Sequence, residues 1–186
     1  MYERDNILRI FKEVKNSLEK GDVAKIKSLS DQTTNSAALT LDPDNIAAAV
    51  IVYSLSKILE REQYKKLPGW NSFYRIYSTS IDNIIKAIEK KDDLSYRKEI
   101  EKIRNAIEKI SGGLKENIKD VFRKASINKA SKLYEHGISM EKTARLLNVS
   151  LAELASYAAE KEIYDIPESK TIPIKQRLKT AIDFFS

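Results

Sequence analysis

The feature that most constrains this fold is the return of apolar residues at steps of three and four along most of the chain. Two stretches show the step most clearly: Phe73, Tyr77, Ile81, Ile84 and Ile88, followed by Tyr96, Ile100, Ile103, Ile107 and Ile110. Side chains at this spacing line one face of an α-helix, whereas a half-buried strand alternates at every second residue. Only 5 of the 186 residues are glycine and 4 are proline, so few turns interrupt the helices. The sequence therefore predicts an all-α protein.

Two segments leave room for other structures. The run from Ile46 to Tyr53 is apolar on all sides, and its β-branched part is compatible with a strand. The helix-start signal at Asp42 and Pro43, together with the alanines that follow, favours a buried helix instead. Residues 28–40 are rich in Ser, Thr and Asn, which makes them the weakest predicted helix.

We predict three parts in the chain. Residues 1–112 form an N-terminal helical bundle, residues 113–165 a trihelical unit, and residues 166–186 a C-terminal tail helix. Gly112 and Gly113 mark a break between the first two parts. However, the apolar step continues past them, so a continuous helix across both glycines is the alternative.

Residues 138–160 carry the pattern of a helix-turn-helix. Ser139 is placed to cap a first short helix, and Ala144 is a small residue where a second helix would cross it. Asn148 suits the left-handed backbone of the turn, and Ser150 with Glu153 forms a capping box at the start of the second helix. The helix predicted over 114–135 would complete the trihelical unit.

This segment resembles small prokaryotic antitoxin-type helix-turn-helix proteins. The resemblance rests on Leu133-Tyr134, Gly137-Ile138-Ser139, Ala144, Val149-Ser150, Glu153-Leu154 and Ala159 through Ile163. Such proteins are often paired with PIN-domain ribonuclease toxins. The resemblance therefore implies a regulator that binds double-stranded DNA and a protein partner.

The candidate DNA contacts are four cations and two hydroxyl groups: Lys129, Lys132, Lys142, Arg145, Ser150 and Ser156. The cations are suited to phosphates, although they could equally form a solvated face. The second helix has none of the Arg, Lys, Asn or Gln side chains that read base edges. Its alanines at 152, 155 and 159 suit close helix packing instead. The alternative is a non-catalytic helical module that contacts protein, or a homodimer, rather than DNA.

The tail after Ile166 contains a short amphipathic pattern, whose apolar members are candidates for protein contact: Ile174, Leu178, Ile182 and Phe185. A helix this short is marginal alone in water and must pack on something. It either docks on the core of its own chain or inserts into the groove of a protein partner, as an antitoxin tail covers its toxin.

Nothing in the sequence predicts an enzyme. There is no cysteine, no phosphate-binding glycine motif and no metal-ligand spacing, so we expect no catalytic residues, no cofactor and no metal. The one histidine, His136, precedes Gly137 at a predicted helix end, where it suits the helix dipole better than acid–base catalysis. The aromatic and basic residues of 64–77 form either a stacking or partner surface or a helix–helix connection whose aromatic side chains cap the bundle.

Charge and hydropathy predict the location of the protein. The net charge of +6 is mild, and its excess falls on the central residues 46–119 rather than on a dense basic arm. The longest apolar run is too short to span a bilayer. The charged N-terminal residues lack the apolar core of a signal peptide. We therefore expect a cytoplasmic protein with no membrane contact.

Overall fold

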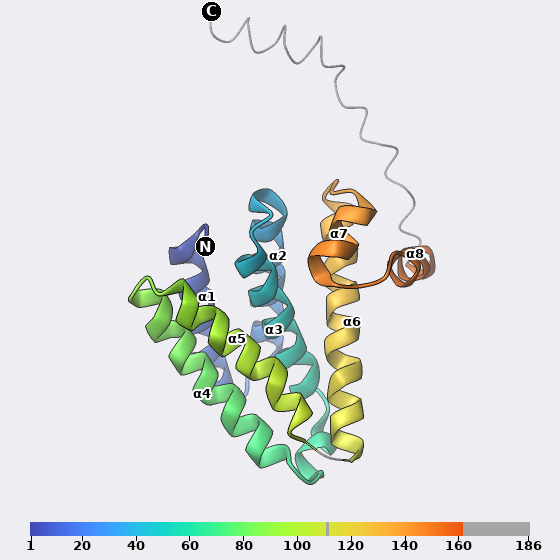
Figure 1. The fold of residues 1–186 in the computed structure, drawn as a ribbon. Helices are drawn as coiled ribbons and strands as arrows, with labels where there is room; N and C mark the ends of the chain where they lie inside the picture. Colours follow the sequence, from blue (N-terminus) through green and yellow to red (C-terminus); the bar gives the residue numbers. More distant parts are fainter. Residues whose placement is uncertain (111, 162–186) are drawn as a thin grey trace, which may run out of the picture.

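The computed structural model describes residues 1–110 and 112–161, and within them every regular element is helical (Figure 1). The predicted all-α fold is thereby confirmed. The elements are α1 (Arg4–Lys20), α2 (Val23–Thr40), α3 (Pro43–Leu59), the 3-10 helix η1 (Glu62–Lys66), α4 (Trp70–Glu89), α5 (Asp93–Glu108), α6 (Gly113–Glu135), α7 (Met140–Leu147) and α8 (Leu151–Glu160). None of the described helices is long and apolar enough to cross a membrane.

The central helix is α3, which includes the ambiguous run from Ile46 to Tyr53. It is a helix, as predicted, and it begins at Asp42 and Pro43 because the Asp42 carboxylate accepts the backbone N–H of Asp44. Nearly every side of α3 is buried, which explains its lack of a polar face. Two buried tyrosines tie other helices to its carbonyl groups: Tyr77 of α4 bonds Ile51 at 2.6 Å, and Tyr96 of α5 bonds Asp44 at 2.9 Å.

The polar stretch at 28–40 also belongs to a helix, the second half of α2. Its hydroxyl groups are satisfied without disturbing the helix. Thr33 and Thr34 donate to carbonyl groups one turn earlier, and Ser30 donates to the Ala49 carbonyl of α3 at 2.9 Å. This segment was difficult to predict because these hydroxyl groups are buried against α3 instead of facing water.

The aromatic segment at 64–77 lies in the core. Tyr64, Trp70, Phe73 and Tyr77 are all buried, and the Trp70 ring stacks on the ring of Tyr74. Of the two interpretations that the sequence allowed, burial therefore supports the structural one. The glycines at 112 and 113 are a break: α5 ends at Glu108, and Gly112 has a left-handed φ of 67° immediately before α6.

Two apolar cores meet at α6. The larger core joins α1 to α5 and receives Leu114, Ile118 and Val121 from the first half of α6. The smaller core joins the second half of α6 to α7 and α8, and it also includes Ile46 and Val50 of α3. The predicted boundary at residue 112 coincides with the start of α6, and α6 contributes to both cores. The predicted tail of 166–186 lies outside the described residues.

Candidate functional site

The last two described helices, α7 and α8, carry the segment predicted to be a helix-turn-helix, and the predicted caps and turn residue are confirmed. The Ser139 hydroxyl caps α7 by accepting the backbone N–H of Lys142. Asn148 is left-handed, with φ 52° and ψ 46°, and ends α7. At α8, the Ser150 hydroxyl accepts the N–H of Glu153 at 3.1 Å, and the Glu153 carboxylate accepts the N–H of Ser150 at 3.0 Å. Both helices pack on α6 (Figure 1).

Packing between these helices depends on small and branched side chains. Ala144 is only 5% exposed, and Thr143, Leu147 and Leu154 are also buried. Tyr157 is half-buried, with its hydroxyl accepting the Nδ2 hydrogen of Asn128 on α6 at 3.0 Å. These residues face the interior of the unit. The assignment of this arrangement to a DNA-binding class stays a prediction.

Two of the predicted DNA contacts are engaged elsewhere. The Lys129 side chain is 1% exposed, and its Nζ lies 3.0 Å from the Asp31 carboxylate of α2 and 4.4 Å from the centre of the Tyr53 ring. Lys132 pairs with the same carboxylate. The prediction that Lys129 contacts DNA is wrong, because this part of α6 packs against α2 and α3 and buries the lysine. Lys132 is only partly available to a phosphate.

Burial changes the titration of this charge cluster. Loss of hydration lowers the pKa of Lys129 to about 8, although the nearby Asp31 carboxylate favours the charged ammonium. Partial burial by itself would raise the pKa of Asp31, but hydrogen bonds and charges from Lys132 and Lys129 outweigh it and lower that pKa. The cluster joins α2, α3 and α6 rather than forming a surface for nucleic acid.

The other four predicted contacts are exposed. Lys142 and Arg145 lie on α7, Ser150 caps α8, and Ser156 lies on the outer side of α8. Two of the four predicted cations are thus exposed, and both lie on α7 rather than α8.

The solvent side of α8 is made of small and apolar side chains. We call this surface the α8 outer face: Leu151, Ala152, Ala155, Ser156 and Ala159, all exposed. Leu151 is 51% exposed, which is high for a leucine. The face has no cation and no amide side chain, so it offers nothing that reads a base edge. Its small side chains allow another helix backbone to approach closely.

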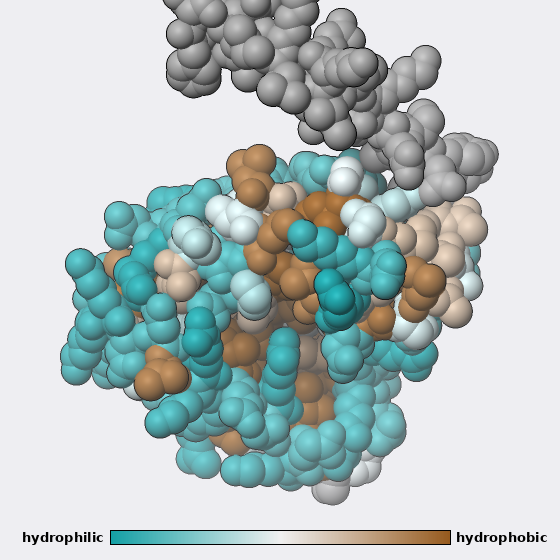
Figure 2. Space-filling model, turned by 45° about the horizontal axis from the view of Figure 1, so that its top comes forward, coloured by the Kyte–Doolittle hydropathy of each residue, from teal (hydrophilic) through white to brown (hydrophobic). Residues whose placement is uncertain are grey.

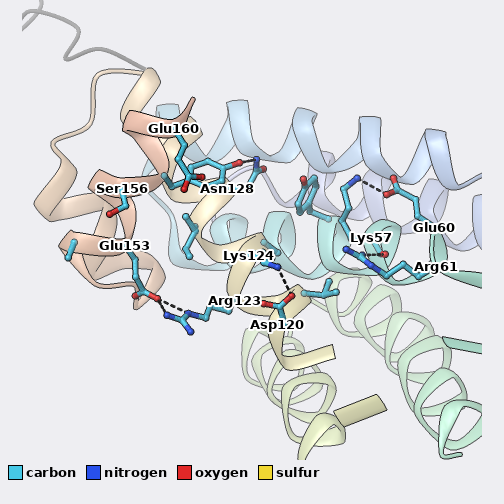
Figure 3. Close-up of a pocket in the computed structure, with 16 residues that line it drawn as sticks. Lys57, Glu60, Arg61, Asp120, Arg123, Lys124, Asn128, Glu153, Ser156 and Glu160 are labelled. Atoms are coloured by element: carbon cyan, nitrogen blue, oxygen red, sulfur yellow. Dashed lines mark hydrogen bonds and ion pairs between the residues drawn. The ribbon is translucent and has the colours of Figure 1, made fainter. Parts of the chain in front are cut away.

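A pocket of about 780 Å³ adjoins the α8 outer face, between α3, α6 and α8 (Figure 3). Ala152 and Ser156 belong to both surfaces. The walls include Tyr53 of α3, Val121, Ala125 and Ile127 of α6, and Tyr157 of α8. A pocket with aromatic and aliphatic side chains in its walls, next to a helix surface of small side chains, can accept large apolar side chains of a ligand.

Six of the eight charged residues that line this pocket form three ion pairs, and the other two, Arg61 and Glu160, carry opposite charges. Lys57 bonds Glu60 at 2.6 Å, Lys124 bonds Asp120 at 2.8 Å, and Arg123 Nε bonds Glu153 at 2.6 Å (Figure 3). Hydrogen bonds from Ser150 and then from Arg123 lower the pKa of Glu153 to about 2, so this carboxylate stays ionised. The rim therefore combines both signs of charge and does not form the strong positive field that attracts a phosphate backbone.

Sequence reasoning missed Asp31, Tyr53 and the pocket. Asp31 lies in the polar stretch of α2, and only packing of α2 on α6 brings it to Lys129, 98 residues away in sequence. The helical spacing of α6 places Lys129 on its buried side, and a buried lysine needs an acidic partner. That need was the signal in the sequence that could have pointed to Asp31.

Comparison of the chain with protein-family models, with characterised proteins and with solved structures found no match. Among residues 1–110 and 112–161, no group of three or more acidic or histidine side chains is placed to hold a metal ion. Function must therefore follow from the surfaces described above.

Proposed function

We propose that this protein is a non-catalytic helical interaction module whose α8 outer face contacts another protein. The single observation that carries the proposal is the juxtaposition of this face with the 780 Å³ pocket. A partner helix can lie against the small side chains of α8 and insert its large apolar side chains into the pocket, which is helix-in-groove recognition.

The chemistry of the surface selects the partner. The charged residues that line the pocket are four of each sign, six of them in ion pairs, and the α8 outer face carries no charge. A strongly acidic or basic ligand would gain little there. An amphipathic helix with a largely uncharged contact face is complementary to this surface, because its binding removes no unpaired charge from water.

The substitution Ala155→Arg separates the two functions, because they predict effects of opposite sign. On a protein-binding face, a long charged side chain prevents close helix packing and weakens association. On a DNA-binding face, an added cation strengthens contact with phosphates. The measurement is the amount of copurifying protein and of copurifying nucleic acid, each relative to the unsubstituted chain.

The matched control is Ala24→Arg, which makes the same change on the exposed side of α2. Loss of a copurifying protein from Ala155→Arg but not from Ala24→Arg supports the proposal. Retention of that protein by Ala155→Arg, or an increase in bound nucleic acid, contradicts it. Size-exclusion chromatography of the pure chain shows whether the partner is instead a second copy.

DNA binding is the second candidate, and exposed Lys142 and Arg145 on α7 favour it. If the chain binds duplex DNA through them, affinity falls steeply with salt. Lys142→Ala and Arg145→Ala each weaken binding on all sequences alike and reduce the salt slope by about one. Mobility shifts unaffected by both substitutions exclude this docking mode.

A further inference from the structure

A groove with an apolar floor and a polar edge lies between α3, α5, α6 and α7, and the Arg123–Glu153 ion pair separates it from the pocket beside α8. Its volume is about 420 Å³, and its floor includes Ala47, Val50, Phe122, Leu146 and Val149. Arg104 and Arg123 lie along its edge. In Figure 2, the molecule shows brown apolar surface at the bottom of a hollow, bordered by teal hydrophilic side chains.

The groove exists because α3 is apolar on all sides and its neighbours do not cover it completely. Ala47 and Phe122 are only partly buried against the larger core, and Leu146 and Val149 only partly buried against the smaller one. The groove therefore runs across the join between the two cores. A hollow with an apolar floor and a few polar groups at its edge can accept the apolar side chains of a ligand.

The same chain contains a segment that matches the groove. Residues 174–185 lie outside the described residues, and their sequence places Ile174, Leu178, Ile182 and Phe185 on one side of a helix. The groove needs apolar side chains, and the segment needs an apolar surface to pack against.

The connection is long enough. Twelve residues, 162–173, link α8 to this segment, and extended they span up to about 40 Å. The longest described helix, α6, has 23 residues and is about 35 Å long. The extended linker is thus longer than α6, so it can reach from the end of α8 to either end of the groove.

We propose that residues 174–185 form an amphipathic helix that occupies the groove between α3, α5, α6 and α7 of their own chain. Tethering favours this occupant, because a short linker holds the segment at an effective concentration near millimolar, which a partner in solution seldom reaches. This inference does not depend on the function proposed for α8.

The test is a nitroxide spin label at Arg104→Cys in the full-length chain. The chain has no cysteine of its own, so the label is confined to the edge of the groove. We expect selective broadening of the backbone amide NMR signals of residues 174–185. A label at Lys20→Cys, on α1 and away from the groove, should leave those signals sharp. Sharp signals with both labels overturn the proposal.

Two further samples identify the occupant and the contact. In a mixture of spin-labelled chain and isotope-labelled chain, broadening arises only between molecules; broadening there equal to that in the single chain overturns docking in the same chain. In the Arg104→Cys sample, Ile182→Asp should restore sharp signals, whereas Gln176→Asp, on the polar side, should not. Equal effects of both substitutions also overturn the proposal.

Discussion

The Lys129 ammonium lies among Asp31, Lys132 and the ring of Tyr53, with almost no contact to water. Such a cation loses more hydration energy than an ion pair restores unless its geometry is excellent. We therefore expect Lys129→Met to leave the free energy of unfolding unchanged or to raise it. Asp31→Asn leaves the cation without its carboxylate and should lower that free energy by about 1–3 kcal/mol. Urea denaturation followed by the fluorescence of Trp70 measures both.

The effect of Lys129→Met on the free energy of unfolding should depend on pH. In the folded chain the pKa of Lys129 is about 8, below its ordinary value of 10.5. Between these two values the unfolded chain binds more protons, so stability of the parent rises with pH in this window. Any advantage of Lys129→Met should therefore shrink from pH 8 to pH 10. An advantage that grows over this range would contradict the assigned burial cost.

Ala144 lies on the buried side of α7. Because it is 5% exposed, Ala144→Asp buries a charge without a partner and should lower the free energy of unfolding by several kcal/mol. Ala155→Asp is the matched control on an exposed position of α8 and should change little. Equal melting temperatures for both variants would show that α7 does not pack as described.

At the scale of elements, the start of α8 depends on its capping box. Ser150→Ala removes the side-chain acceptor at the helix start and should cost about 1 kcal/mol of unfolding free energy. It should also raise the pKa of Glu153 toward its ordinary value, because Ser150 supplies the largest lowering effect. Titration of the Glu153 carboxyl carbon by NMR measures the pKa. An unchanged pKa would mean that Arg123, rather than the cap, holds the carboxylate ionised.

The sequence predicted the elements well because their signals are local. Asp42, Ser139, Asn148 and Ser150 act on residues within one turn, so their roles as caps and turn residues were readable without the fold. Partners distant in the chain were not readable. Lys129 was assigned to a surface because nothing near it in sequence indicates Asp31, and the pocket requires three helices to assemble first.

At the scale of the whole molecule, α6 connects two cores and lies between two surfaces. The pocket beside α8 adjoins one side of α6, and the groove over α3 adjoins another. Phe122 and Ile127 of α6 line different surfaces, and the Arg123–Glu153 ion pair borders both of them. With the tail segment in the groove as proposed, the α8 outer face would remain open to the proposed partner.

The most direct test of the α8 assignment is photo-crosslinking in the cells that make the protein. A photoreactive phenylalanine analogue replaces Ala155 on the α8 outer face or Arg145 on α7, and the crosslinked product is analysed for protein and for nucleic acid. The account predicts a protein adduct that forms from position 155 and carries no nucleic acid. A nucleic-acid adduct at position 155, or adducts from position 145 alone, would contradict it.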